Sequence, residues 1–269
     1  MLSNAYVAVY FTCADDGIGR FDRSMLSQQS LMELFLFGLA KPEKICRHRD
    51  DPADVCEWKG VKCNADGKVE EFHWICKNEN GTGSLGFEFL PCSMKIVQMF
   101  RNALSGTIQL ADLPGKMEGV YLYENKLAGS LDLDRLPSTV RTLNLSRNKF
   151  TGEISPEHLP KCLEYLAVPD SQLMGTICLT SLPPAFKSLY LRRNTFEGSL
   201  DFRRLPKSMC TMNLSENHFS GTIDLGNLPE SMMYLDVRNN DISGTVRVPH
   251  GLTSGFDGNE QLTVERIEE

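Results

Sequence analysis

The chain has 269 residues, of which 41% are hydrophobic and 23% charged, and its formal net charge is −7. This composition is ordinary for a globular protein, and no apolar run approaches the 18 or so residues that a membrane span needs. The acidic balance argues against nucleic acid as a partner, because nucleic-acid binders normally carry a basic surface that neutralises phosphates.

The chain starts with a short apolar stretch, residues 1–14, that has no basic residue before it. A secretory signal normally begins with a positively charged segment, so the match to one is poor. The alternative interpretation is a short strand or mobile tail that covers the next part of the fold.

An amphipathic helix is predicted at about residues 24–39, where Asp22 or Ser24 would cap its start. The apolar residues at helical spacing are Leu26, Leu31, Leu34, Phe35 and Leu39. We expect this helix to cover the apolar end of the segment that follows it.

The remaining chain is dominated by an internal repeat of 23 residues. An asparagine returns at this interval, with Ser171 in one place, at Asn102, Asn125, Asn148, Asn194, Asn217 and Asn240. Leu-Pro pairs and glycines keep the same interval, the glycines at Gly106, Gly129, Gly152, Gly175, Gly198, Gly221 and Gly244. Coincident periods without an insertion are the signature of a repeat protein.

One copy, residues 140–154, shows what each repeat does. Leu143 and Leu145 are two residues apart and point inward from a short strand, while Thr142 and Asn144 face out. Equivalent strands would stack in parallel about 4.8 Å apart, and each coil buries its apolar side only against its neighbours. The repeated asparagine lies where the strand ends. We expect it to bond buried peptide groups of the turn, which would cost about 1–3 kcal/mol each if unpaired.

The pattern LxxLxLxxNxLxGxI over residues 69–250 resembles the leucine-rich repeat family, in a form similar to its plant-type subclass. Residues 56–63, Cys-Glu-Trp-Lys-Gly-Val-Lys-Cys, are similar to the amino-terminal cap of that subclass. The Leu-Pro pairs and the 23-residue period differ from the usual plant-type repeat. Similar Leu-Pro repeats occur in protist proteins.

This resemblance implies an α/β-type solenoid: a right-handed array with a parallel sheet on its concave face and an amino-terminal capping helix. It divides the chain into a tail and cap (1–68), one degenerate and seven regular repeats (69–250) and a carboxy-terminal tail or cap (251–269). It also implies a disulfide between Cys56 and Cys63.

The compartment stays open. A cap disulfide favours a secreted or cell-surface protein. The nine cysteines are an odd number, however, and Cys162, Cys178 and Cys210 share no column of the repeat, as expected of free thiols in an intracellular protein. Zinc is the competing explanation for the early cysteines, but their spacings lack a tight pair. We predict no metal and no cofactor.

The outward face of the strands is rich in aromatic residues and arginine, the types enriched in binding hot spots. We predict that it contacts a partner through Phe100, Arg101, Tyr121, Tyr123, Asn144, Arg147, Tyr165, Tyr190, Arg192, Arg193, Asn213, Tyr234, Asp236 and Arg238. The alternative is that these side chains only stabilise the sheet by contacts between neighbouring strands.

Catalysis has little support, since the five histidines share no register and no catalytic motif occurs. Asp132, Asp201 and Asp224 share one outer column, which we interpret as a hydrated face. In the fourth regular repeat, Pro169 follows the strand and Ser171 replaces the asparagine, which predicts either a small bulge or a notch for a partner.

The first functional hypothesis is a non-enzymatic scaffold that binds a protein or peptide on its strand face, as a recognition module or as a subunit of an assembly. The second is recognition of carbohydrate or another small ligand. In that case Tyr121, Tyr123 and Tyr190 would stack on rings and Asn144, Asn213 and Asp236 would supply hydrogen bonds.

Overall fold

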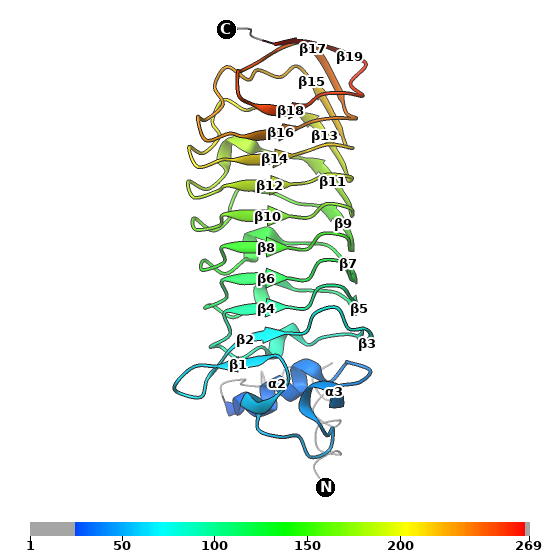
Figure 1. The fold of residues 1–269 in the computed structure, drawn as a ribbon, viewed down its shortest axis with the longest axis vertical. Coiled ribbons are helices and arrows are strands. Elements are labelled where there is room, and N and C mark those ends of the chain that lie inside the picture. The colour runs from blue at the N-terminus through cyan, green and yellow to red at the C-terminus, as the bar shows by residue number, and fades with distance from the viewer. Residues whose placement is uncertain (1–24, 267–269) are drawn as a thin grey trace, which may run out of the picture.

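The structure, a computed structural model, describes residues 25–266, without the side chains of residues 78–80. The repeats form the coils of an elongated solenoid that are stacked along its long axis (Figure 1). Two sheets run along the stack and the apolar core lies between them. No helix among the described residues is both long and apolar enough to cross a membrane.

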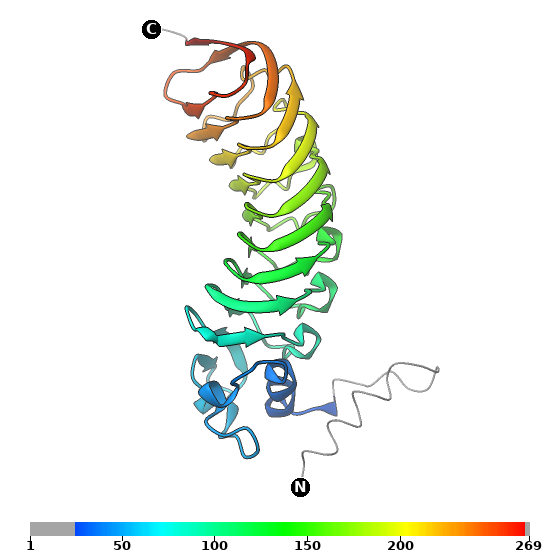
Figure 2. The same ribbon diagram turned by 90° about the vertical axis from the view of Figure 1, so that its right-hand side faces the viewer.

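The first sheet confirms the predicted parallel strand array. All its strands pair in parallel except the first two, and successive strands from β4 to β16 match residues 23 apart, as Leu143 matches Leu166. This sheet lies on the inner side of the curved stack (Figure 2). Its strands, in spatial order, are β1 (Val61–Cys63), β2 (Val69–His73), β4 (Ile96–Gln98), β6 (Gly119–Tyr121), β8 (Thr142–Asn144), β10 (Tyr165–Ala167), β12 (Ser188–Tyr190), β14 (Thr211–Asn213), β16 (Tyr234–Asp236) and β18 (Thr253–Gly255).

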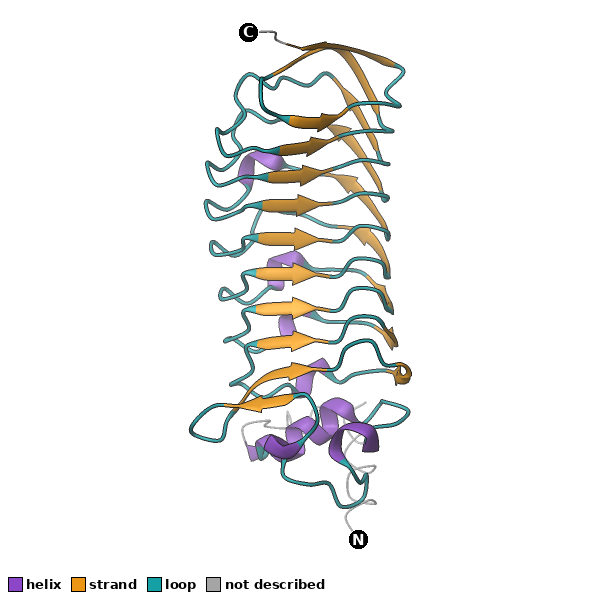
Figure 3. Cartoon of the chain, in the orientation of Figure 1, coloured by secondary structure: helices purple, strands orange, loops and turns teal. Residues whose placement is uncertain are grey.

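A second sheet of nine strands, which the sequence analysis did not predict, begins at or just after the asparagine column (Figure 3). Its residues pair with a different offset: Gln172 matches Thr151, only 21 residues earlier. Its strands are β3 (Asn78–Gly83), β5 (Asn102–Gly106), β7 (Lys126–Gly129), β9 (Lys149–Glu153), β11 (Gln172–Thr176), β13 (Thr195–Ser199), β15 (His218–Gly221), β17 (Asp241–Val248) and β19 (Gln261–Arg266).

The repeated glycine is required by this second sheet. At Gly198 the backbone has φ +85°, and an added Cβ would lie 3.0 Å from the Thr176 methyl group of the preceding coil. Gly129 and Gly244 meet a threonine of the preceding coil in the same way. A side chain at these positions would therefore be strained by both the backbone conformation and the close contact.

The core between the sheets consists of the predicted inward columns. Residues of the column that contains Leu143 are at most 2% exposed, and those of the column that contains Phe150 at most 1%. Phe196 and Phe219 stack at 6.2 Å between ring centroids. Because each coil covers the apolar side of the next, the core is continuous along the solenoid.

The asparagines form a continuous hydrogen-bonded ladder. The Nδ2 group of Asn125 donates to the carbonyls of Met99 and Leu122, at 2.8 and 2.9 Å, and so joins two successive coils. Asn259 makes the same contacts. It follows Asn240 by 19 residues instead of 23, so the repeat interval did not predict it.

Short 3-10 helices follow the outer side of several coils: η3 (Phe87–Phe89), η4 (Leu110–Asp112), η5 (Leu133–Arg135) and η6 (Leu179–Ser181). The outer aspartates lie at the starts of such turns. Asp201 and Asp224 accept hydrogen bonds from the backbone N–H two residues later, and Asp132 is the N-cap of η5. A hydrogen bond from Arg203 holds the pKa of Asp201 at about 2. Asp201 and Asp224 thus bond to turns in their own coils, and Asp132 pairs with Arg135 at 3.7 Å.

The amino-terminal end is covered by two helices, α2 (Gln28–Leu36) and α3 (Glu43–Cys46), and by the 3-10 helix η2 (Val55–Glu57). Helix α2 is shorter than the predicted 24–39. Ser27, rather than an earlier residue, caps it by accepting from the Ser30 N–H at 3.1 Å, and Asp22 and Ser24 lie outside the described residues. The ring of Phe35 meets Phe72 of the first coil edge to face at 5.9 Å. The helix therefore seals the apolar end of the array.

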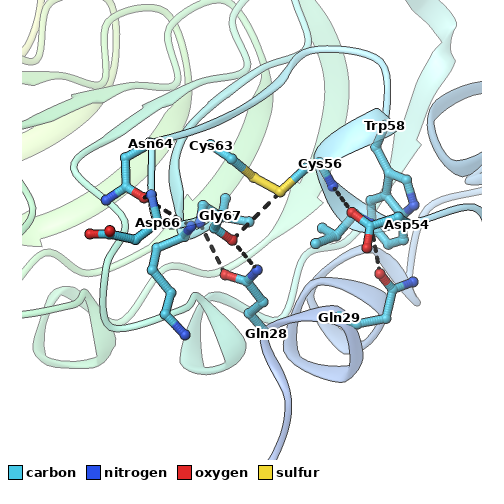
Figure 4. Close-up of a disulfide and its surroundings, with 12 residues drawn as sticks. Gln28, Gln29, Asp54, Cys56, Trp58, Cys63, Asn64, Asp66 and Gly67 are labelled. Carbon is cyan, nitrogen blue, oxygen red and sulfur yellow. Dashed lines mark hydrogen bonds between the residues drawn. A yellow bond between two sulfur atoms is a disulfide. The ribbon is translucent and has the colours of Figure 1, made fainter.

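The disulfide between Cys56 and Cys63 is present, with Cα atoms 5.7 Å apart (Figure 4). Gln28 of α2 donates to the Gly67 carbonyl at 2.5 Å and accepts from the Val69 N–H at 3.0 Å. The helix, the turn between β1 and β2 and strand β2 are thereby joined. The other cysteines among the described residues are free, and burial raises the pKa of the Cys46 thiol.

At the opposite end, strands β18 and β19 extend both sheets beyond residue 250. Leu252 and Phe256 are buried there, at 8% and 7% exposure. The segment predicted as a tail or cap thus packs on the last coil as a further, shorter coil.

Candidate binding face

The inner sheet presents three outward columns over the six coils from β4 to β14. We call these eighteen residues the central panel. In register, they are Ile96, Gly119, Thr142, Tyr165, Ser188 and Thr211; Gln98, Tyr121, Asn144, Ala167, Tyr190 and Asn213; and, two residues further along each coil, Phe100, Tyr123, Ser146, Pro169, Arg192 and Ser215.

Aromatic side chains gather in the panel, as the sequence predicted. The rings of Phe100 and Tyr123 stack at 4.2 Å and 11°, and those of Tyr165 and Tyr190 lie 5.5 Å apart. Burial raises the pKa of Tyr165, and Tyr190, Tyr121 and Tyr123 raise it further. The four tyrosines therefore form one cluster, although they come from three different coils.

Two asparagines of the panel are held as hydrogen-bond donors. The Oδ1 atom of Asn144 accepts from the Ser146 N–H and hydroxyl, at 3.2 and 2.6 Å, and that of Asn213 accepts likewise from Ser215. Both Nδ2 groups donate to no atom of the described residues. The Asn-Leu-Ser sequence thus fixes the amide and leaves its N–H groups available to a ligand.

One edge of the panel is a row of charges that alternate in sign. We call this row the first rim: Glu70, Lys95, Glu118, Arg141, Glu164 and Lys187. Lys95 pairs with Glu70 at 2.9 Å, and Glu164 pairs with both Arg141 and Lys187, at 3.1 and 2.5 Å. Lys187 and then Arg141 lower the pKa of Glu164, although partial burial acts against them.

The opposite edge, the second rim, alternates in the same way through Arg101, Glu124, Arg147, Asp170, Arg193 and Glu216. Five ion pairs link all six residues in sequence, at distances of 2.8–3.5 Å. Each has a positive φ of 52–56°, because the chain turns here from the strand into the asparagine ladder. Arg101, Arg147 and Arg193 were predicted to contact a partner, and the structure shows that carboxylates already bind them.

The predicted residues Tyr234, Asp236 and Arg238 lie one coil beyond the panel. Asp236 is only 1% exposed and accepts from Tyr234 at 3.0 Å and from Arg238 at 2.7 Å. Burial raises the pKa of Asp236, but the hydrogen bonds from Arg238 and Tyr234 outweigh burial and lower it overall. These residues bond to one another rather than joining the tyrosine cluster.

The fourth regular repeat keeps its place in the inner sheet. Strand β10 pairs with β8 and β12 in unbroken register, and the Pro169 carbonyl accepts from the Arg147 N–H at 2.8 Å. In the neighbouring coils the N–H at the position of Pro169 makes no backbone hydrogen bond to the next coil. The proline is thus tolerated, and the irregularity is confined to Ser171, whose buried Oγ has no partner.

Outside the panel, the structure contains a hollow of about 450 Å³ lined in part by Asp132, Asp134, Glu153 and Glu157. No group of three or more histidine, cysteine or acidic side chains within residues 25–266 is placed to hold a metal ion.

Comparisons with known proteins agree with this geometry. The family model described as Leucine Rich Repeat matches residues 139–162, and no curated protein matches the chain. Many solved structures are similar to it, and the following three are among those that cover most of the chain. A plant ice-binding protein has 19% identity and a TM-score of 0.57, with 87% of this chain and 94% of that one covered.

The second is the ectodomain of the plant membrane receptor kinase GASSHO1/SCHENGEN3 from Arabidopsis thaliana, in complex with CASPARIAN STRIP INTEGRITY FACTOR 2, at 23% identity and a TM-score of 0.65; 89% of this chain and 29% of that one are covered. The third, PEPR1-AtPEP1, has 18% identity and a TM-score of 0.56, over 89% of this chain and 41% of that one. This chain therefore spans less than a third of the second solved chain and less than half of the third, and the likeness concerns the fold.

Proposed function

Because the chain folds as a leucine-rich repeat solenoid similar to the plant-type form, we propose that it is a non-enzymatic scaffold that binds a protein or peptide on the central panel. The observation that carries this proposal is the cluster of Tyr121, Tyr123, Tyr165 and Tyr190 on the inner sheet. Tyrosine offers a large contact area together with a hydroxyl, and it is enriched where binding energy is concentrated.

The way the panel is held supports the same function. Its strands are three residues long and are backed by a fully buried apolar column, while the asparagine ladder fixes the turn behind them. A surface held in this way loses little conformational entropy when a partner binds, so more of the contact energy contributes to affinity.

A protein or peptide is a better candidate than a carbohydrate. Two of the three similar structures carry a named partner in their descriptions, and neither partner is described as a carbohydrate. In this chain, Asp236 was expected to help bind a sugar, but it is buried and bound to Tyr234 and Arg238. Of the three polar residues predicted to bind a sugar, only Asn144 and Asn213 have side-chain N–H groups available on the outward face.

The proposal that the protein is not an enzyme rests on how its ionisable groups are distributed. His73 lies beside Glu71 at the amino-terminal end of the inner sheet, and His158 pairs with Asp134 on another face. The strongly paired carboxylates of the rims bind arginine and lysine side chains. None of these groups is arranged around a nucleophile.

The test is affinity capture from the source organism with the full chain and with a Tyr121→Ala, Tyr123→Ala, Tyr190→Ala variant, followed by binding of the purified partner. A matched control, Thr107→Ala, Ser130→Ala, Thr222→Ala, removes three exposed side chains that directly follow strands β5, β7 and β15 of the second sheet. We expect a stoichiometric protein that the wild type and the control bind and the tyrosine variant loses. Equal capture by all three folded proteins would place the interface elsewhere.

A further inference from the structure

We propose that the partner meets the central panel with an uncharged, extended peptide segment, and that two of its backbone carbonyls accept hydrogen bonds from Asn144 and Asn213. This inference rests on the proposed function and specifies the partner's chemistry. It depends on three observations: where charge is absent, how the charges around the panel are paired, and where the free donors lie.

The panel itself is almost free of charge. Seventeen of its eighteen positions hold uncharged residues. The exception is Arg192, whose Nε and Nη2 atoms both donate to Oε1 of Glu216, at 2.9 and 2.5 Å. A charged side chain pressed onto this surface would lose water without gaining an opposite charge, which is unfavourable.

The two rims do not supply the missing charge. Each contains three cations and three anions in strict alternation. Ion pairs link all six residues of the second rim and, in the first rim, join Glu70 to Lys95 and Glu164 to both Arg141 and Lys187. Arg193 and then Arg192 lower the pKa of Glu216, so its negative charge is retained for these partners. A peptide between the rims therefore faces no net field that would select acidic or basic side chains.

The free donors suit an extended backbone. Asn144 lies on β8 and Asn213 on β14, three strand spacings away, which is about 14 Å. An extended peptide advances about 3.4 Å per residue, so this distance corresponds to carbonyls four residues apart. Carbonyls at that even separation point to the same side of an extended chain.

The side chains between these donors also suit a peptide. Ala167 matches Asn144 on one side and Tyr190 on the other, so a small, buried residue lies between an amide and an aromatic ring. Because Ala167 is only 1% exposed, neighbouring side chains already cover it, and a partner side chain would contact the tyrosine rings themselves. The six coils of the panel span about 24 Å, enough for roughly seven extended residues.

The critical variant is Asn144→Asp, Asn213→Asp. Aspartate keeps the oxygen that accepts from Ser146 or Ser215, and Asp236 shows that the column holds an aspartate in this turn, since it accepts from the Arg238 N–H at 3.1 Å. The substitution removes both outward donors and adds charge to the panel. A matched control, Thr107→Asp, Thr222→Asp, adds the same charge at exposed positions directly after strands β5 and β15 of the second sheet.

The probe is a phage-displayed library of random dodecapeptides, panned against the full chain and each variant. For the wild type we expect enriched peptides with an uncharged central segment whose affinity is nearly constant from about 0.1 to about 1 M salt, over which the Debye length falls from about 10 to about 3 Å. Affinity should fall at least about tenfold in the Asn144→Asp, Asn213→Asp variant and stay unchanged in the control.

Two other outcomes have different meanings. If peptides bind the panel, as shown by loss in the tyrosine variant, but carry charged central segments or weaken strongly with salt, the inference is wrong and the proposed function stands. If no enriched peptide depends on the tyrosines, the panel does not bind extended peptides and this inference is overturned, while the affinity capture with the tyrosine variant decides the proposed function.

Discussion

The Oδ1 atom of Asn125 accepts a hydrogen bond from the backbone N–H of Leu104, 21 residues earlier, at 3.1 Å. Asn148, Asn194, Asn217 and Asn240 each accept in the same way from the preceding coil. At Ser171 the side chain is too short to reach the equivalent N–H of Phe150, and its own hydroxyl is buried without a partner.

We therefore expect Ser171→Asn to stabilise the protein by about 1 kcal/mol, because it would complete the ladder. The measurement is equilibrium unfolding in denaturant. The matched control is Asn217→Ser, which copies the irregularity into a regular coil and should destabilise by about 1–3 kcal/mol. A less stable Ser171→Asn protein would show that the serine fits its site better than the ladder pattern suggests.

Cys162 should be replaceable by serine with little loss. Its thiol lies near the Ser138 and Val140 carbonyls, at 2.8 and 3.4 Å, where the hydroxyls of Thr139, Ser208 and Ser231 donate in other coils. Cys162→Val removes the donor and should cost about 0.5–1.5 kcal/mol more than Cys162→Ser in the same unfolding assay. Equal stability of the two variants would mean that this donor contributes nothing.

Breaking the cap disulfide should destabilise the amino-terminal end. Cys56 and Cys63 close a loop of seven-residue separation, for which loop entropy predicts a loss of about 2–3 kcal/mol. The loss of stability is measured by hydrogen exchange of the amides of helix α2 with and without reductant. In a Cys56→Ser, Cys63→Ser protein, reductant should no longer change this exchange. Unchanged exchange in α2 would show that the contacts of Phe35 with Phe72 and of Gln28 with Gly67 and Val69 hold the cap alone.

The second rim should contribute stability that depends on acid pH. Arg193 and then Arg192 lower the pKa of folded Glu216 below the unfolded value of about 4.3, so folding favours the ionised form. This contribution is present above pH 4.3 and is lost as pH falls through the lower folded pKa.

Glu216→Gln should accordingly lower the melting temperature slightly at pH 7, by an amount that reflects less than about 1 kcal/mol per exposed pair. Its difference from wild type should vanish at the acid end of a pH series. Glu260→Gln, at an exposed position directly before strand β19, serves as the control. A difference that persists unchanged into acid would assign the effect to packing instead.

The stacking of the coils was predictable because every repeat has the same physical task. Leu143 and its equivalents must be buried, so the period of the apolar residues sets the strand register. The asparagine ladder followed from the need to pair peptide groups at a buried turn. The second sheet was not predictable, because its strands contain a glycine with positive φ and mostly polar outward residues, and this pattern is typical of a loop.

The candidate site was predicted in part. Aromatic residues at outward strand positions indicated the tyrosine cluster, because columns 23 residues apart become neighbours. The pairing of Arg101, Arg147 and Arg193 was missed, although a signal was present: the residue before each ladder position alternates in sign. Helix α2 was predicted too long because its periodicity continues through Leu39, whereas Ser27 and Gly38 set its limits.

The two rims also change sign together. The coils that begin at Lys95, Arg141 and Lys187 are cationic at both edges, and those that begin at Glu118 and Glu164 are anionic at both. Loss of one coil, residues 118–140, would put Lys95 beside Arg141 and Arg101 beside Arg147, whereas loss of two would restore opposite neighbours. Like charges side by side on adjacent strands are unfavourable. The geometric unit of this solenoid is one coil, but its electrostatic unit is a pair of coils. Duplication or deletion of an even number of coils therefore keeps opposite charges side by side and destabilises the array least.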